Sequence, residues 1–148
     1  MKRKPISKEV RELVYHKFGK HCAYCGCYLE NIKDMQVDHF APVYLFGDNI
    51  DIKNLYPACR SCNKYKDTFT IEKFRDQLSK IPERLSRDVT TYNIAKRYGM
   101  IQETKKPIKF FYEEYTSVLD FDDLANKILN KNIADIKTGN EEEVSEKL

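Results

Sequence analysis

The spacing of apolar residues in the first third of the chain predicts a helix followed by a short strand. From Val10 to Phe18 the apolar side chains recur at helical spacing, Ser7 stands where an N-cap is expected, and Gly19 suits the end of the helix. Residues 34–40 alternate between apolar and polar positions, which is typical of a half-buried strand. We therefore expect a fold that contains both helices and strands.

The middle of the chain predicts two further helices after a less regular segment. Residues 52–55 are expected to form a strand or a turn, and a helix is expected to start at Asn63. Another helix is predicted to start after Thr70, because Phe69 and Phe74 stand at the two positions of a hydrophobic staple around that N-cap.

The second half of the chain is mainly helical in its pattern. A helix is predicted over residues 86–98, closed by Gly99, and a strand is predicted over residues 108–112, paired with residues 100–102 in a short hairpin. Residues 120–129 predict a strongly amphipathic helix. Its apolar face consists of Phe121, Leu124, Ala125, Ile128 and Leu129.

These elements predict the α+β class, with three parts along the chain. We expect a core over residues 1–69, an extension over residues 70–137 that packs on the core or mediates dimerisation, and a disordered acidic tail over residues 138–148. Several aromatic residues of the extension are expected to be buried, and the alternative is that they stack on nucleic-acid bases. They are Tyr92, Tyr98, Phe110, Phe111 and Tyr112.

Composition narrows the class of protein. Of the 148 residues, 41% are hydrophobic and 33% are charged, which indicates a soluble globular protein. No apolar run approaches the roughly 20 residues that cross a bilayer, and no apolar stretch of a secretory signal follows the basic start of the chain. We therefore expect a cytoplasmic protein with no membrane partner, in which paired cysteines bind metal rather than form disulfides.

The charge of the chain is unevenly distributed. Residues 1–80 contain 15 Lys and Arg against 10 Asp and Glu, whereas residues 81–148 contain 11 against 13. The first part is therefore the one expected to face a polyanion, and the last part is not.

Four of the five cysteines form two Cys-x-x-Cys pairs separated by 33 residues. A two-residue spacer lets both thiolates of a pair bind one ion, so two such pairs predict one tetrahedral zinc per chain. Four thiolates leave no open coordination position, and the zinc is therefore expected to be structural. The predicted ligands are Cys22, Cys25, Cys59 and Cys62. Cys27 has no partner at a suitable spacing and is expected to be a packed or partly exposed thiol.

Polar residues between and beside the cysteine pairs indicate a second metal site. Asp38 and Asn63 offer hard oxygen ligands, which suit Mg²⁺ or Mn²⁺ rather than zinc. His39 is expected to point to the opposite strand face from Asp38 and to act as general base toward a water molecule. Asn54 is suited to holding the loop and His39 through amide hydrogen bonds. Because the cysteine pairs fix the chain on both sides, we expect these four side chains to lie close together.

Together these residues resemble the HNH endonuclease family with its ββα-metal fold, and most of all the zinc-containing branch that includes phage resolving endonuclease VII. The resemblance covers roughly residues 15–70 and rests on the two cysteine pairs, Asp38-His39, Pro42, Gly47, Asn54-Leu55, Asn63 and Lys66. Asn63 stands in place of the final histidine of the family name and still offers an oxygen ligand.

What the resemblance implies is hydrolysis of DNA phosphodiester bonds, with one divalent metal per site and 5′-phosphate products. It implies Asp38 and Asn63 as metal ligands, His39 as general base and Asn54 as a positioning residue. By analogy with the family, a role in restriction, phage defence or a mobile element is expected.

The partner expected from these residues is DNA. The candidates for phosphate contacts are Lys20, Arg60, Lys64 and Lys66. A homodimer would explain double-strand cleavage by a single-site nuclease, and the extension could instead bind a partner protein. Two other functions remain open: a non-catalytic zinc module that binds nucleic acid or protein, and a ribonuclease with the same metal site.

Overall fold

The fold begins with a capped helix. The computed structural model describes residues 4–48, 50–116, 122–128 and 130. Helix α1 (Lys8–His16) starts as predicted, because the Ser7 Oγ accepts a hydrogen bond from the Val10 amide at 3.3 Å. Gly19, with φ 60°, and Lys20, with φ 65°, form a left-handed turn after the helix. This turn leads the chain into the first cysteine pair.

The described residues form a sheet of two antiparallel strands, β1 (Met35–His39) and β2 (Leu55–Cys59). Met35 lies opposite Cys59, and His39 lies opposite Leu55. The strand predicted over residues 34–40 is thus confirmed, with a 3₁₀ turn η1 (Ile32–Asp34) before it. Residues 52–55 turn out to be mostly a turn, η2 (Ile52–Asn54), and the second strand starts only at its end.

Helix α3 (Arg60–Lys66) follows β2 directly and completes a ββα unit. Its N-cap is Cys59, whose Sγ accepts a hydrogen bond from the Cys62 amide at 3.4 Å. The predicted start at Asn63 was therefore wrong, because Cys59 already caps the helix one turn earlier. The connection between β1 and β2 carries the short helix α2 (Val43–Phe46).

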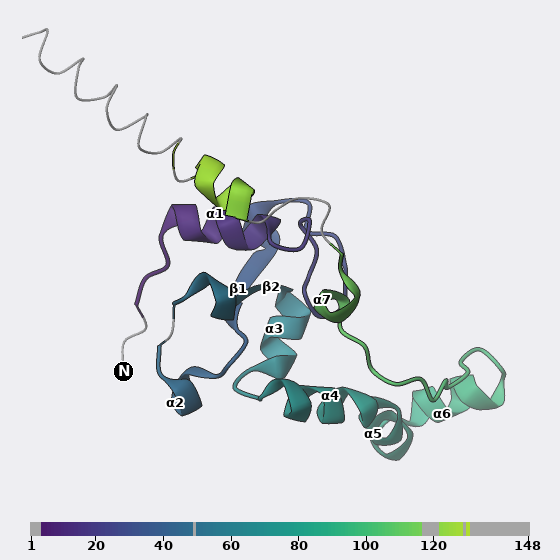
Figure 1. Cartoon of the computed structure of the whole chain (residues 1–148). Coiled ribbons are helices and arrows are strands. Elements are labelled where there is room, and N and C mark those ends of the chain that lie inside the picture. Colours follow the sequence, from purple (N-terminus) through teal and green to yellow (C-terminus); the bar gives the residue numbers. More distant parts are fainter. Residues whose placement is uncertain (1–3, 49, 117–121, 129, 131–148) are drawn as a thin grey trace, which may run out of the picture.

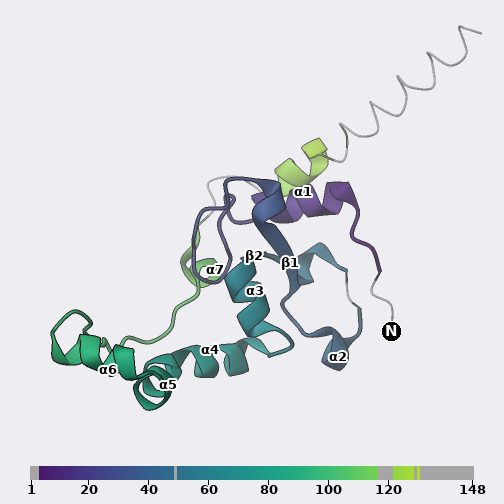
Figure 2. The same cartoon turned by 180° about the vertical axis from the view of Figure 1, so that it is seen from behind.

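The two-stranded ribbon lies between α1 and α3 (Figures 1 and 2). On the α1 side, Met35 and Leu55 are buried with Val14 in one apolar cluster. On the other side, Ala58 belongs to a second cluster that includes Phe74. Because strand side chains alternate between faces, each side of the ribbon faces its own small core.

Helix α4 (Ile71–Ser79) has the predicted cap at Thr70, whose Oγ1 accepts a hydrogen bond from the Lys73 amide at 3.3 Å. Phe69 and Phe74, the predicted staple residues, both pack in the second cluster. This helix therefore contributes to the same core as the ββα unit, and the division of the chain at residue 69 stays a prediction.

The helix predicted over residues 86–98 is two helices, α5 (Ile81–Asp88) and α6 (Thr90–Arg97). Val89, between them, has extended backbone angles of φ −124° and ψ 100°. The Asn93 side chain donates a hydrogen bond to the Ser86 carbonyl at 2.6 Å. That carbonyl would accept from residue 90 in a continuous helix, so the asparagine compensates for the break.

The predicted hairpin was wrong, because residues 100–102 and 108–112 contain no strand. The second segment instead runs into helix α7 (Phe111–Glu114). Its amides pair with the first cysteine turn: Phe111 N donates to Tyr24 O at 3.0 Å and Tyr112 N donates to Ala23 O at 2.9 Å. Local pattern could not show that these amides would pair with a segment about 90 residues earlier.

Residues 122–128 are helical and lie beside α1, as both views show (Figures 1 and 2). This confirms the middle of the helix predicted over residues 120–129, while residues 120, 121 and 129 lie outside the described residues. The acidic tail over residues 138–148 also lies outside them, so its predicted disorder stays untested. None of the helices in the described part of the chain is long and apolar enough to span a membrane.

Candidate functional site

The four predicted zinc ligands come together in space. The sulfur atoms of Cys22, Cys25, Cys59 and Cys62 all lie within 4.8 Å of one another. The Cys25 and Cys59 sulfurs are 3.8 Å apart, which equals the edge of a tetrahedron with zinc–sulfur bonds of about 2.3 Å. Cys27 is exposed and takes no part in the cluster. The donor set therefore fits a structural zinc ion.

Two turns from distant parts of the sequence build this cluster. In the first turn, the Gly26 amide donates to the Cys22 carbonyl at 3.0 Å, and Gly26 has φ +75°. A Cβ at this position would lie 2.7 Å from the Phe111 ring, so only glycine fits. The Ala23 amide donates to the Pro57 carbonyl at 2.8 Å, which ties the first turn to β2.

The thiols of the cluster cannot all ionise without a cation. A hydrogen bond from Cys62 lowers the pKa of the Cys22 thiol to about 4, and the same contact raises the pKa of Cys62. Burial raises the pKa of Cys25. The Cys22 thiolate is therefore favoured while those of Cys25 and Cys62 are disfavoured, because crowded negative charges disfavour each other. A divalent metal ion supplies the positive charge that four thiolates need.

A cleft of about 560 Å³ reaches Asn63, the residue directly after Cys62. Three of the predicted catalytic residues, Asp38, His39 and Asn63, line it together with α2. Among the described residues that line the cleft, none is Lys or Arg, and Asp67 adds a further carboxylate. Carboxylate and amide oxygens without competing cations in the lining fit a hard divalent ion such as Mg²⁺ or Mn²⁺.

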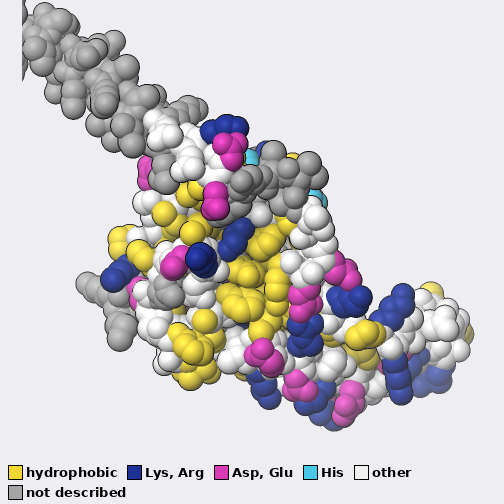
Figure 3. All heavy atoms as spheres, viewed as in Figure 1, with side chains coloured by type: hydrophobic (Ala, Val, Ile, Leu, Met, Phe, Trp, Pro, Cys, Tyr) yellow, Lys and Arg dark blue, Asp and Glu magenta, His cyan; other side chains and the backbone are white. Residues whose placement is uncertain are grey.

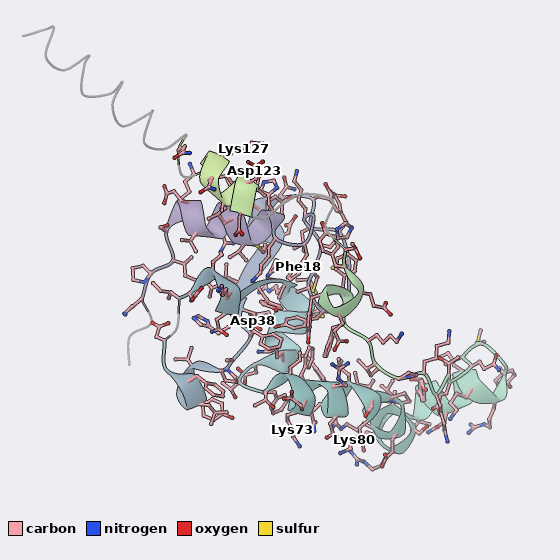
Figure 4. The ribbon with its side chains drawn as sticks, in the orientation of Figure 1. Phe18, Asp38, Lys73, Lys80, Asp123 and Lys127 are labelled. Atoms are coloured by element: carbon pink, nitrogen blue, oxygen red, sulfur yellow. The ribbon has the colours of Figure 1, made fainter. Side chains whose placement is uncertain are left out.

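Two buried side chains, Tyr24 and Lys66, fix the orientation of the Asp38 carboxylate. It is only 6% exposed and lies in the middle of the body close to α3 (Figure 4). Its Oδ2 accepts a hydrogen bond from the Tyr24 hydroxyl and lies 2.9 Å from the Lys66 ammonium. Burial raises the pKa of the Asp38 carboxyl, and the Lys66 charge acts in the opposite direction. Both contacts use Oδ2, so Oδ1 is the oxygen left for a metal ion.

Lys66 was predicted to contact DNA, and the structure corrects this assignment. The side chain is fully buried, and its ammonium also donates to the His39 carbonyl at 3.0 Å. It therefore fixes both the Asp38 carboxylate and the backbone of His39 from inside the protein. A cation in this position cannot reach a phosphate on the surface.

The loss of this buried ammonium should be costly. We expect Lys66→Met to lower the free energy of unfolding by about 3–5 kcal/mol, because the Asp38 charge is left buried without a partner. Urea denaturation of the zinc-loaded protein measures the change. The control Lys64→Met removes an exposed charge from the same helix and should change stability by less than about 0.5 kcal/mol. The double variant Asp38→Asn/Lys66→Met should recover part of the loss; no recovery would show that packing, not charge, dominates.

His39 points to a different partner from Asp38, as the alternation of β1 requires. Its Nε2 lies 3.3 Å from the Oδ1 of Asp48, and both side chains are about one-tenth exposed. Among the described residues these two atoms are the buried side-chain polar atoms without an aligned hydrogen bond. Because each is the nearest partner for the other, a small rotation completes the bond. The other oxygen of Asp48 accepts from the Lys4 amide at 2.6 Å.

Asn54 lies behind the cleft, not in it. Its Oδ1 accepts from the Ala41 amide at 2.8 Å, and its carbonyl accepts from the Phe40 amide at 2.9 Å. These bonds close the base of the β1–β2 connection directly after His39. The geometry agrees with the positioning role expected from the sequence.

The remaining predicted DNA contacts are dispersed. Arg60 and Lys64 are exposed on α3 but do not line the cleft. Lys20 lines a separate hollow together with Glu9, Glu12 and Glu30. Lys20 is therefore not part of the cleft.

Sequence reasoning missed Tyr24 and Asp48. Tyr24 lies between two zinc ligands, and its position in that turn was a signal that a side chain there would be buried beside the site. Asp48 follows Gly47 in a loop, where an aspartate usually only stabilises a turn. Its approach to His39 depends on how the long connection folds back, and no local pattern indicates that.

Comparison with known proteins agrees with this geometry. Residues 22–69 match the family model described as HNH endonuclease, which confirms the resemblance over about a third of the chain. The matched segment runs from the first zinc ligand through both strands, the cleft and α3. Residues 22–69 are therefore similar to an HNH endonuclease domain, which indicates nuclease-type activity in general. No curated protein and no solved structure matches the chain.

Proposed function

We propose that this protein is a metal-dependent endonuclease that hydrolyses phosphodiester bonds in DNA. The observation that carries the proposal is the convergence of Asp38, His39 and Asn63 in one cleft beside the four-cysteine cluster. The first two come from β1 and the third from α3, in the segment that matches the HNH family. DNA is the substrate that this family match favours.

His39 is the proposed general base. One ring nitrogen faces Asp48, which leaves the other to accept a proton from the attacking water. A carboxylate beside one imidazole nitrogen keeps the proton on that nitrogen, so the free nitrogen has its lone pair available. His39 then holds this proton while the phosphorus–oxygen bond to the leaving group breaks.

Asp38 and Asn63 are the proposed ligands of a Mg²⁺ or Mn²⁺ ion. When bound, this ion offsets the negative charge that develops on the phosphate and on the leaving oxygen. Tyr24 and Lys66 hold the Asp38 carboxylate in one orientation. Asn54 holds the segment after His39. The catalytic side chains are thus preorganised before substrate binds.

The experiment that tests this function is cleavage of supercoiled plasmid. Purified protein should convert the plasmid to nicked or linear DNA with Mg²⁺ or Mn²⁺, and a chelator of these ions should stop the reaction. A His39→Ala variant purified in the same way controls for a contaminating nuclease. The proposal fails if neither DNA nor RNA is cleaved under any metal condition, and the protein is then a non-catalytic zinc module. Cleavage of RNA but not DNA would identify a ribonuclease.

The contact between Asp48 and His39 makes a separate prediction. We expect Asp48→Asn to lower kcat by about 10- to 100-fold, the range for carboxylates that orient a functional histidine. KM for DNA and the required metal concentration should not change, because the substitution does not move the side-chain oxygens of Asp38 and Asn63. Steady-state kinetics with a metal titration measures both quantities.

A spectroscopic readout separates orientation from a general structural effect. In ¹⁵N NMR, the wild type should show one His39 tautomer, protonated on Nε2, and Asp48→Asn should show a mixture. Asp48→Glu should restore part of the rate. An unchanged tautomer with a reduced rate would mean that Asp48 acts on the loop and not on the histidine.

A further inference from the structure

Helices α5 and α6 and the loop after them project from the body as an arm, here defined as residues 81–109 (Figures 1 and 2). Neither helix has a buried residue. The arm is joined to the body by α4, by Arg84, which donates to the Tyr65 hydroxyl at 2.8 Å, and by Ile108, which packs against the second cluster. Helices with so little apolar burial add little to the stability of the core. Their surface is therefore available to a binding partner.

The arm is the most basic part of the second half of the chain. It contains seven Lys and Arg against three Asp and Glu, whereas residues 110–148 contain four against ten. The small net charge of residues 81–148 is therefore the sum of a basic segment and an acidic segment. The expectation that residues 81–148 do not face a polyanion rested on their combined charge and stays a prediction. Figure 3 shows Lys and Arg side chains gathered along the arm.

Three cations of the arm have no acidic partner. Within the described residues, Lys96 pairs with Glu103, and Arg87 pairs with its neighbour Asp88. Arg97, Lys105 and Lys106 form no such pair and are exposed. Exposed cations without acidic partners give the arm a positive potential that attracts an anionic partner.

The arm also exposes two large apolar side chains next to Arg97 in the sequence. Tyr98 is 81% exposed and Met100 is 80% exposed, so the expected burial of Tyr98 was wrong. An exposed aromatic ring among unpaired cations is the combination that contacts nucleic-acid backbone and bases.

The cleft offers no cationic side chain to a DNA backbone, because no Lys or Arg is among the described residues that line it. Phosphate contacts supply most of the affinity of proteins for DNA, and they must come from outside the cleft. The arm carries three exposed cations that form no ion pair among the described residues.

We propose that the arm, through Arg97, Tyr98, Lys105 and Lys106, binds the phosphate backbone of duplex DNA whose scissile bond lies in the cleft. The proposal rests on the proposed function only in taking DNA as the substrate. Arg97, Lys105 and Lys106 neutralise phosphates, and Tyr98 packs against the exposed face of the sugars or bases. The occupant is nucleic acid rather than a second copy, because cations without acidic partners lie on this surface.

The salt dependence of DNA binding tests this proposal. Each phosphate contact contributes about 0.9 to the slope of log K against log salt concentration for duplex DNA. We expect Lys105→Gln/Lys106→Gln to lower the magnitude of this slope by about 2. Both lysines lie on a loop without regular structure, so the variant should fold. Fluorescence anisotropy with a labelled 30-base-pair duplex measures the slope, in a His39→Ala background that keeps the DNA intact.

The matched control is Lys8→Gln/Lys127→Gln, which removes the same charge at the α1 end of the molecule. Lys127 is labelled there in Figure 4, far from the arm. Its slope should equal that of the parent protein. Equal slopes for the arm variant and the parent, or no DNA binding by the parent, overturn the proposal. A salt-dependent dimer abolished by the arm variant overturns it as well, since the arm then binds the acidic segment of a second copy.

Failure of the proposed function gives a different result. If the wild type cleaves no plasmid but the arm variant still shows the reduced slope, the arm binds DNA and the nuclease assignment fails. If the wild type cleaves plasmid and the slopes are equal, only the arm proposal fails. The two measurements therefore separate the two inferences.

Discussion

Replacing Cys59 with serine should leave the protein without a cooperative unfolding transition. Zinc binding at sites of this kind is worth about 10–16 kcal/mol in zinc-finger peptides, which exceeds the total stability of a small domain. Cys59 is also the last residue of β2, the N-cap of α3 and the partner of Met35 across the ribbon. Loss of the metal therefore releases the elements that carry the whole cleft.

Circular dichroism during thermal unfolding measures this effect, together with the zinc content per chain. The wild type should contain one zinc and unfold in one step, and a strong chelator should reproduce the behaviour of the variant. Cys27→Ser is the control, because Cys27 is exposed and lies outside the cluster. The zinc assignment is wrong if Cys59→Ser unfolds at the wild-type temperature with no bound metal.

The zinc cluster could be predicted because its chemistry is repeated in the sequence. Two identical spacings restrict where four sulfurs can go, and the structure places all four within bonding range of one ion. The helix caps at Ser7 and Thr70 were predictable for a similar reason, since a cap acts on the amide three residues later. Local rules suffice where the interacting atoms are close in sequence.

The predictions that were wrong concern contacts between residues far apart in the sequence. Lys66 looked like a surface cation, and only its contact with Asp38, across the interface between α3 and β1, shows that it is buried. The segment over residues 108–112 has a strand-like pattern, yet its amides pair with the first cysteine turn. Both depend on contacts between distant segments. A single sequence gives the propensity of each segment but not its partner.

The largest effect on activity is expected from His39→Ala. Removing a general base typically costs about 10²- to 10⁴-fold in rate, and we expect a loss of cleavage in this range. The zinc content should stay at one per chain, because His39 is outside the cysteine cluster. The Asp38 contacts with Tyr24 and Lys66 do not involve the imidazole, so the fold should persist.

A metal titration assigns the roles of the two cleft residues. If His39 is the base, His39→Ala lowers the maximal rate and leaves the half-saturating Mg²⁺ or Mn²⁺ concentration unchanged. If Asn63 is a ligand, Asn63→Ala raises that concentration, and excess metal restores part of the rate. His16→Ala, a histidine on α1 outside the cleft, should behave as wild type. A rate in His39→Ala equal to the wild type would remove the base from the mechanism. An unchanged metal requirement in Asn63→Ala would leave Asp38 and Asp67, the two carboxylates that line the cleft, as the remaining acidic ligand candidates.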